Sequence, residues 1–257
     1  MRFFHPNLID ASGVTITASS QASTSLAGAN VAHEFKSKVW RTGTSSADES
    51  VVFDLGSAKD VTGLIIFAHT LTGSDSGLEL RASTDNFATS DDLIASLTYS
   101  PDAIEAVFSV QTYQYWKVTF TKSASGESRD IGRIWLGEYY ETTVQPDFDG
   151  LRITPKDLSV KNRTAGGQTY SEVRPQYRMI ELDFSGVSTS MKDDLRTVTS
   201  STGVSKSLFV QIDPNGTSEA QEILYVKFTD IPNPKADGIG PDGDITWAMK
   251  ISLEEQL

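Results

Sequence analysis

Residues 131–141 read "IGRIWLGEYYE", and two related stretches precede them, "SVVFDLGSAKDV" (50–61) and "YQYWKVTFTK" (113–122). In each stretch apolar residues either alternate with polar ones or form a short continuous run. These are the patterns of β-strands that are buried on one face or on both. In 131–141 the alternation places Ile134 and Leu136 on the inward face. The three stretches predict a β-sandwich that closes with the last of them.

The rest of the first half has the same character. Alternation runs through 51–55, 78–81 and 116–120, while "GLIIFAH" (63–69) is a continuous apolar run, as expected of a strand buried on both faces. Clusters of Ser, Thr, Gly and Asp separate these stretches. Several short strands with turn signals between them indicate a sandwich or jelly roll.

A break in the pattern lies at 141–150, "ETTVQPDFDG", which contains a proline, a glycine and two aspartates. Such a composition is typical of a connection between elements. We therefore predict a domain boundary that divides the chain into residues 1–143 and 144–257. The chain is expected to be mainly β, with an N-terminal jelly-roll sandwich followed by a second β-sandwich that carries one helix.

The predicted helix of the second half is 190–203, "SMKDDLRTVTSSTG". Ser190 is expected to cap its start and Gly203 to end it. The apolar stripe is narrow, which predicts a helix lying on a sheet. This stripe consists of Met191, Leu195 and Val198.

Three strands of the second half are expected to bury alternate side chains. The longest of them is the last, and we expect its whole apolar face to lie in the core. The residues predicted to point inward are Ile180, Leu182 and Phe184, then Leu224, Val226 and Phe228, then Ile245, Trp247, Met249, Ile251 and Leu253.

Composition excludes several kinds of chemistry. The chain has no cysteine, so disulfides, cysteine-ligated zinc, iron–sulfur clusters and thiol nucleophiles are ruled out.

The net charge of −12 is spread over both halves, with 10 Lys+Arg against 17 Asp+Glu in 1–143 and 12 against 17 in 144–257. A uniformly acidic surface argues against binding to nucleic-acid phosphates. No apolar run predicts a signal peptide or a membrane helix, so we expect a soluble protein made in the cytoplasm.

No catalytic motif is recognisable. His5, His33 and His69 lack the spacing of a metal site, and no G-x-S-x-G elbow is present. "GIGPDG" (238–243) has the glycine spacing of a dinucleotide loop but opens a predicted strand instead of a helix, so we interpret it as a hairpin loop. We expect no enzyme activity, no cofactor and no metal site from side chains, while calcium held by backbone carbonyls stays open.

Aromatic residues near predicted loops offer the only candidate binding site. Trp40, Phe87 and Tyr99, with Phe35 nearby, could stack on a sugar. They could equally cap the ends of the sandwich core, which is the interpretation that we favour, because aromatic side chains are common core fillers.

The order of motifs in the first half resembles the discoidin, or galactose-binding-like, family over about residues 5–140. The glycine of "DLG" is expected to end its strand in a sharp turn, and Arg133 to brace the N-terminal region. The terminal cysteines usual in that family are missing, which makes an extracellular role less expected. The resemblance rests on Trp40, on 54–56 ("DLG"), on Ser83 and Asp85, on 115–118 and on 133–138.

The second half resembles a family of bacteriophage and prophage tail proteins, some of which pair it with a galactose-binding-like domain. This resemblance implies a structural protein of the tail tip or baseplate of a long-tailed phage, similar to a distal tail protein with a tail-tube-like fold. The stretches that carry it are "AGGQTYSEVRPQYRMIELDF" (165–184), "GVSKSLFVQIDP" (203–214), "ILYVKFTDIP" (223–232) and "WAMKISLEEQL" (247–257).

The function implied is a ring, expected to be hexameric, that joins the tail tube to the tip. Its partners would be further copies of itself, the tail tube protein and the hub or fibre proteins of the tip. DNA would pass through the lumen without specific binding, and no membrane would be contacted. The protein would be made in the host bacterial cytoplasm and located in the virion. The alternative is a carbohydrate-binding module that contacts host surface glycans, and a third possibility is a glycan-active enzyme.

Net charge predicts how such a ring, built through 144–257, responds to salt. Subunits that each carry −12 repel one another, and the Debye length falls from about 8 Å at physiological ionic strength to about 3 Å at 1 M. Assembly of the full chain should therefore become more favourable as salt rises, measured by sedimentation across a salt series. Oligomers that dissociate with salt would show instead that opposite charges hold the contact.

Overall fold

The computed structural model describes residues 1–43, 48–122, 127–147, 149–215 and 222–257. Contacts divide the chain into two units. The first unit is Pro6–Tyr139, and the second combines Met1–His5 with Tyr140–Leu257.

This division differs from the predicted one, 1–143 and 144–257, at both ends of the first domain. The reason is β1 (Arg2–Phe4), which pairs with β14 (Leu208–Gln211) and buries Phe3 in the core of the second unit. The other neighbour of β1 in that sheet is β9 (Tyr139–Glu141). The first unit is thus inserted between two adjacent strands of the second.

The first unit is a jelly-roll sandwich of seven strands in the order β3-β8-β4-β7-β5-β6, with β2 pairing to β4. Short 3₁₀ turns lie at Leu8–Asp10, Thr24–Leu26 and Gly28–Ala32, and the first and last of them add Ile9 and Val31 to the core. The strands are β2 (Thr15–Ala18), β3 (Trp40–Arg41), β4 (Asp48–His69), β5 (Ser76–Ser83), β6 (Asp92–Ser96), β7 (Ala103–Thr121) and β8 (Asp130–Gly137).

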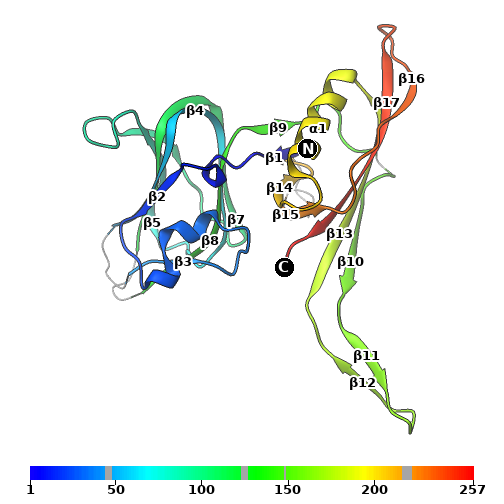
Figure 1. Ribbon diagram of the computed structural model, residues 1–257, viewed down its shortest axis with the longest axis horizontal. Coiled ribbons are helices and arrows are strands. Elements are labelled where there is room, and N and C mark those ends of the chain that lie inside the picture. The colour runs from blue at the N-terminus through cyan, green and yellow to red at the C-terminus, as the bar shows by residue number, and fades with distance from the viewer. Residues whose placement is uncertain (44–47, 123–126, 148, 216–221) are drawn as a thin grey trace. The chain divides into compact units, whose positions relative to one another are not determined.

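The long strand β4 arches over this unit and contributes to both layers of the sandwich (Figure 1). Its first part pairs with β2 and the end of β7, and its last part pairs with β8 and the start of β7. Gly56 lies at the arch with φ +74°, a conformation that suits glycine. The prediction that the strand ends at Gly56 is wrong, because the register shifts between Asp54 and Lys59 and pairing then resumes.

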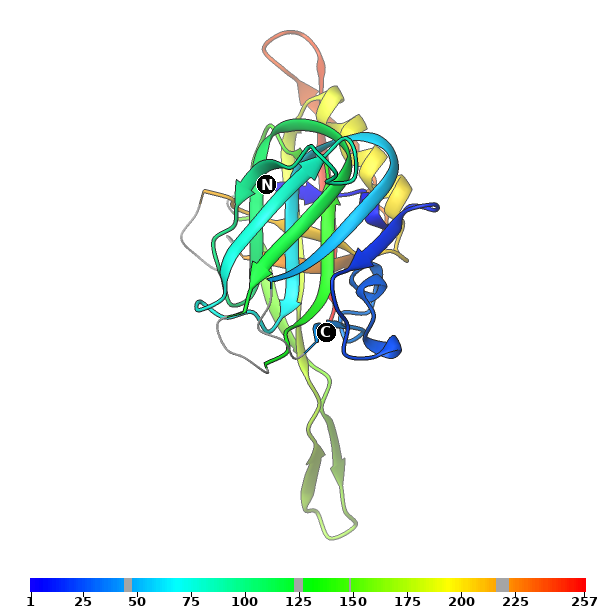
Figure 2. The same ribbon diagram turned by 90° about the vertical axis from the view of Figure 1, so that its left-hand side faces the viewer.

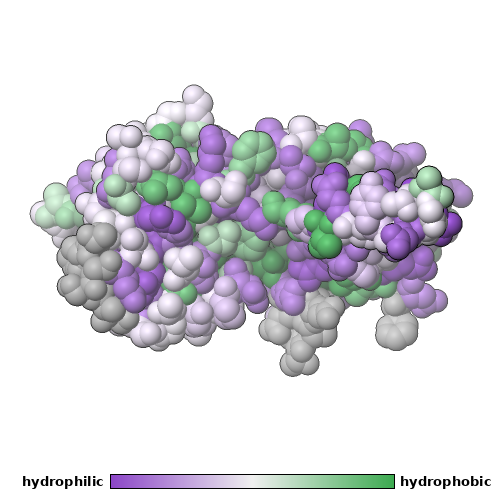
Figure 3. Space-filling view, turned by 90° about the horizontal axis from the view of Figure 1, so that it is seen from below, coloured by the Kyte–Doolittle hydropathy of each residue, from purple (hydrophilic) through white to green (hydrophobic). Residues whose placement is uncertain are grey.

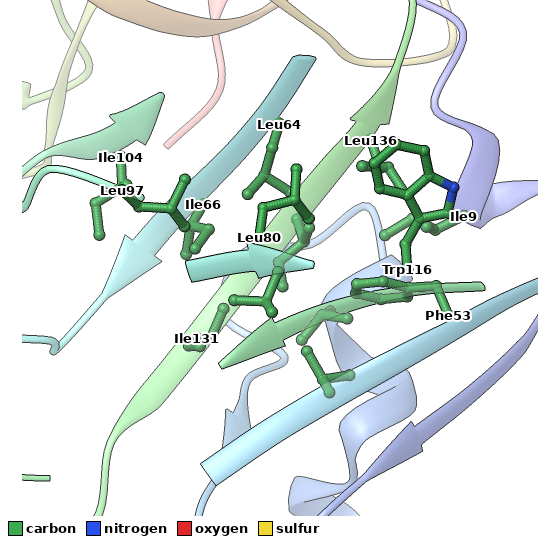
Figure 4. Packing of buried hydrophobic residues seen from close by; sticks show 14 of the residues in the cluster. Ile9, Phe53, Leu64, Ile66, Leu80, Leu97, Ile104, Trp116, Ile131 and Leu136 are labelled. Atoms are coloured by element: carbon green, nitrogen blue, oxygen red, sulfur yellow. The ribbon is translucent and has the colours of Figure 1, made fainter. Parts of the chain in front are cut away.

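The core of the first unit confirms the predicted inward faces. Ile134 and Leu136 are fully buried, as are the alternating positions of β4 and β7. Arg133 braces the N-terminal region as predicted, through an ion pair with Asp10. Figure 4 shows the packing around Phe53, Leu64, Ile66, Leu80, Ile104, Trp116, Ile131 and Leu136.

The second unit is built on an eight-stranded sheet in the order β10-β13-β17-β15-β14-β1-β9, with β16 pairing to β17, and a separate hairpin, β11–β12. This confirms a mainly β chain with one α-helix in the described residues. The helix is not long and apolar enough to cross a membrane, and the same holds for the shorter helical turns of the described ranges. The remaining strands are β10 (Arg152–Asp157), β11 (Val160–Arg163), β12 (Thr169–Glu172), β13 (Gln176–Val187), β15 (Ile223–Phe228), β16 (Lys235–Ile239) and β17 (Ile245–Glu255).

The helix α1 (Thr189–Thr202) has its N-terminal cap at Ser188, two residues before the predicted cap Ser190. The Ser188 side chain, not that of Ser190, accepts a hydrogen bond from the Met191 N–H at 3.2 Å. Gly203 ends the helix with φ +58°, as predicted. The predicted stripe is buried against the sheet: Met191, Leu195 and Val198.

The last strand is buried only in part. Met249, Ile251 and Leu253 lie in the core, but Trp247 is half-buried and Ile245 is 52% exposed. The start of β17 pairs with β16 as a hairpin that extends past the other strands, so no second layer covers it (Figure 1). The prediction of a fully buried face is therefore wrong at Ile245. The turn 240–243 at the tip confirms the hairpin interpretation of "GIGPDG".

Burial sets the expected cost of truncation along β17. Ile251→Ala should lower the free energy of unfolding by about 2–5 kcal/mol, the range for a buried large aliphatic residue. Trp247→Ala should cost less than about 3 kcal/mol, because the half-buried ring has a smaller contact area to lose than a fully buried tryptophan. Urea denaturation of the full chain measures both. A larger loss for Trp247→Ala than for Ile251→Ala would contradict the burial described here.

Candidate functional site

A groove of about 410 Å³ lies on the outer face of the first unit, over β4, β5 and β7. Figure 2 views this unit face on. The register places Arg81 opposite Lys117 and Glu79 opposite Thr119. Since Leu80 points into the core, its neighbours along β5 point outward and line the groove.

Charged side chains in the groove form a connected network. Arg81 pairs with Glu79 and with Asp91, both at 2.7 Å, and Lys117 pairs with Asp91 at 3.2 Å. Burial opposes ionisation of Asp91, but hydrogen bonds from Arg81 and Lys117 hold its pKa below the ordinary value. Hydrogen bonds to Asp91 and Glu79 raise the pKa of Arg81. Asp91 and Arg81 are therefore held ionised, and the ion pairs hold the side chains of the network against one another.

Phe87 adjoins this network through Lys117, although it is not one of the residues that line the groove. The Lys117 Nζ lies 3.9 Å from the centroid of the Phe87 ring, a cation–π contact. Phe87 has φ +63° and Asn86 has φ +58°. Positive φ is uncommon for a bulky side chain and persists only where its surroundings enforce it, at a cost of about 1–3 kcal/mol.

Ser83 and Asp85 provide that enforcement. The Ser83 hydroxyl accepts hydrogen bonds from the N–H groups of Asp85 and Phe87 at 3.1 and 2.9 Å and donates to the Asp85 carboxylate. Asp85 in turn accepts from the N–H groups of Ala88, Thr89 and Ser90 and from the Thr89 hydroxyl. These bonds, the one from the Thr89 hydroxyl first, hold the pKa of Asp85 well below its ordinary value. The Ser-x-Asp motif thus fixes the loop that presents Phe87.

The other predicted aromatic contacts do not belong to the groove. Trp40 is fully buried, with its Nε1–H donating to the Ser20 carbonyl at 2.8 Å, so the prediction that it contacts a glycan is wrong. It fills the core, packing edge-on against Phe120. The favoured alternative of a core aromatic is right for Trp40.

Tyr99 is 38% exposed but lies away from Phe87. It follows β6 at the end where the Leu97 N–H bonds to the Leu78 carbonyl, whereas Phe87 follows the opposite end of β5. There Tyr99 packs edge-on against His69, with ring centroids 6.2 Å apart. Phe35 is 62% exposed and contacts His33. Of the predicted glycan contacts, Phe87 alone is both partly exposed and in contact with a charged residue that lines the groove, Lys117, within the part of the chain that the structure describes.

Sequence reasoning missed Arg81, Asp91 and Lys117. Alternation marks Arg81 and Lys117 as outward-facing, but the pairing of β5 with β7 that makes them neighbours is not visible in the chain. Among the described residues no group of three His, Asp or Glu could hold a metal ion.

No family model matches the chain, and no curated protein matches it. Chitosan-binding module 1 of a chitosanase/glucanase from Paenibacillus sp. IK-5 is a similar solved structure, with 17% identity, 52% of this chain and 100% of that chain covered, and TM-score 0.42. The module CpGH89CBM32-6 from Clostridium perfringens is 20% identical, with 52% of this chain and 99% of that chain covered, and a TM-score of 0.43. A Ruminococcus gnavus GH29 fucosidase in complex with fucose is 16% identical. The match covers 54% of this chain and 28% of that chain, with a TM-score of 0.48. The likeness describes the jelly-roll arrangement of strands over about half of this chain.

The Asp85 network predicts a specific acid dependence. Because the folded state lowers the pKa of Asp85, its stabilising contribution is present above the unfolded value of about 3.9 and is lost as pH falls through the folded value. Asp85→Asn should lower the melting temperature at pH 7 and flatten its decline below pH 4. Asp102→Asn, an exposed change in the same unit, is the control. Melting curves of Asp85→Asn that stay parallel to the parent from pH 7 to 2 would contradict this.

Proposed function

We propose that the first unit binds carbohydrate in the groove over β4, β5 and β7, with one sugar ring against Phe87. The observation that carries the proposal is the Phe87 ring, held in a strained conformation beside the fixed network of Arg81, Asp91 and Lys117. Strain of this kind is often maintained at functional sites. Phe87 is half-buried and lies outside the core cluster of the first unit.

The chemistry of the groove suits a sugar. A pyranose ring has an apolar face of C–H groups that can pack on an aromatic ring, and hydroxyls that both donate and accept hydrogen bonds. Arg81 offers donors in a planar fork, and Glu79 and Asp91 offer acceptors. A volume of about 410 Å³ falls within the usual range for ligand sites of about 300–1,000 Å³.

Charge indicates which sugars fit. The lining has two cations, Arg81 and Lys117, against four carboxylates, so the groove carries 2 − 4 = −2. Anionic sugars would be repelled, and neutral glycans are the class expected. The carboxylates are Asp48, Glu49, Glu79 and Asp91.

The test is a glycan array with the full chain, followed by calorimetric titration of the best ligand. Phe87→Gly removes the ring while matching the positive φ, so that the loop is not strained further. It should weaken binding about tenfold, the equivalent of roughly 1.4 kcal/mol. Phe35→Ala removes an exposed aromatic outside the groove and should leave affinity unchanged. No saturable binding by the parent, or equal losses in the two variants, would refute the proposal.

A second candidate function is the structural role in a phage tail tip, a ring component contacting the tail tube and the tip proteins. The observation that favours it lies in the second unit, which has two extended hairpins, β11–β12 and β16–β17. Apolar residues on or beside them are exposed: Tyr170 and Val173, and Ile239 and Ile245. Exposed strands and apolar patches are typical of assembly surfaces. Electron micrographs of the purified chain would show rings if this role holds, and particles of single-subunit size at all concentrations would speak against it.

A further inference from the structure

The hairpin β11–β12 and its flanks, residues 158–174, form what we call the arm. All residues of β11 and β12 are exposed, and their two-stranded sheet pairs with no other strand. Within the second unit the arm extends beyond the end of β10 and β13 (Figures 1 and 2). Bonds between Ser159 and Arg174 at its base and between Thr164 and Gln168 at its tip hold it together.

An arm of this kind is poorly stabilised by itself. An isolated two-stranded hairpin is marginally stable at best in water. Apolar side chains along it face solvent, with Val173 87% and Tyr170 59% exposed. Viewed from below, hydrophobic residues are interspersed among hydrophilic ones on the surface (Figure 3). These features indicate that the arm is covered by something else when the protein functions.

The register separates the arm into two faces. Val160 lies opposite Glu172 and Asn162 opposite Tyr170, so these four share one face. Lys161 lies opposite Ser171 and Arg163 opposite Thr169 on the other face, which alternation extends to Val173. We call the second of these the basic face. It combines two cations with the most exposed apolar side chain of the arm.

Charge identifies the kind of surface that fits the basic face. The arm has three basic residues and one acidic residue, a net charge of 3 − 1 = +2, so the rest of the chain carries −12 − 2 = −14. Arg174 pairs with Glu172 inside the arm. Neither Lys161 nor Arg163 forms a salt bridge among the described residues, although the charge of Lys161 contributes to lowering the pKa of Asp157 at the base of the arm. The arm is thus a cationic element on an acidic protein.

We propose that the arm docks through its basic face, Lys161, Arg163 and Val173, on the acidic surface of a second copy of this chain. The complementary charges, +2 on the arm and −14 on the remainder, make another copy a suitable partner. The proposal does not depend on sugar binding. It gives the second candidate function a defined contact.

Arm docking reverses the expected response to salt. Net charge alone predicts that association strengthens as salt screens the repulsion. A contact between the basic face and carboxylates weakens as salt rises, because screening acts on the attraction itself. Sedimentation velocity of the full chain from 50 mM to 1 M salt therefore distinguishes the two cases. Association that weakens with salt indicates attraction through the basic face, and association that strengthens with salt indicates repulsion between net charges.

Two variants test the arm itself. Replacing 158–175 by Asn-Gly joins Asp157 to Gln176, which are cross-strand partners, through a two-residue turn that keeps the β10–β13 register. The double reversal K161E/R163E changes only the basic face. Both should raise the dissociation constant of the oligomer at least tenfold, and thermal melting confirms that each variant is folded.

Two controls keep the result specific. K38E/K59E makes the same change in net charge at exposed positions of the first unit, and Tyr170→Ser alters the opposite face of the arm. Both should associate like the parent.

A parent that is monomeric at every salt, or an arm deletion that associates like the parent, would overturn the proposal. Equal loss in K161E/R163E and K38E/K59E would attribute the effect to net charge and overturn it too. Retarded migration of DNA by the parent but not by K161E/R163E, without self-association, would assign the arm to nucleic acid instead.

Discussion

The ladder between β4 and β7 is the contact on which the first unit depends. It joins the two strands in one layer from Asp48 to Asp54 and again in the other layer from Gly63 to Phe67, with the arch at Gly56 between. A slip of one residue in this ladder would turn Trp116 and Val118 to solvent and bring Lys117 into the core. The same register that buries the core therefore places the charged groove on the outside. The β4–β7 pairing thus determines both which side chains form the core and which line the groove.

Alternation in the sequence was sufficient to predict which side chains of each strand point inward. It holds for β4, β7, β13 and β15, because a period of two records directly which face of a strand is buried. In β8 the predicted inward residues Ile134 and Leu136 lie in the core, but the other face of the strand is buried as well. Alternation failed where burial depends on what lies above the strand. Ile245 continues the alternation of Ile251 and Leu253 without a break, yet the hairpin that carries it extends beyond any covering layer. Pairing between distant segments was equally hidden, so β1 was assigned to the wrong unit.

The candidate site shows the same limit at the level of single residues. Phe87 could be singled out because an aromatic residue in a polar loop is conspicuous, whereas Arg81 and Lys117 look like ordinary outward positions of separate strands. Trp40 was conspicuous for the same reason as Phe87, and only its hydrogen bond to Ser20 and its burial separate the two. Ser83 and Asp85 belong to the motifs that resemble the discoidin family. Their physical role, a hydrogen-bonded loop that tolerates positive φ, depends on atoms that a sequence does not place.

The insertion of the first unit between β1 and β9 has a consequence for how the chain folds. The second sheet needs both strands, yet 139 − 6 + 1 = 134 residues separate His5 from Tyr140. Closing a flexible loop of that length costs entropy that grows with the logarithm of its length, and non-local pairings of this kind slow folding. A jelly roll that has already folded holds its own two ends in fixed places and replaces the long flexible loop by a compact connector. The first unit would then act as a template for the second, and folding would proceed from the inserted unit outward.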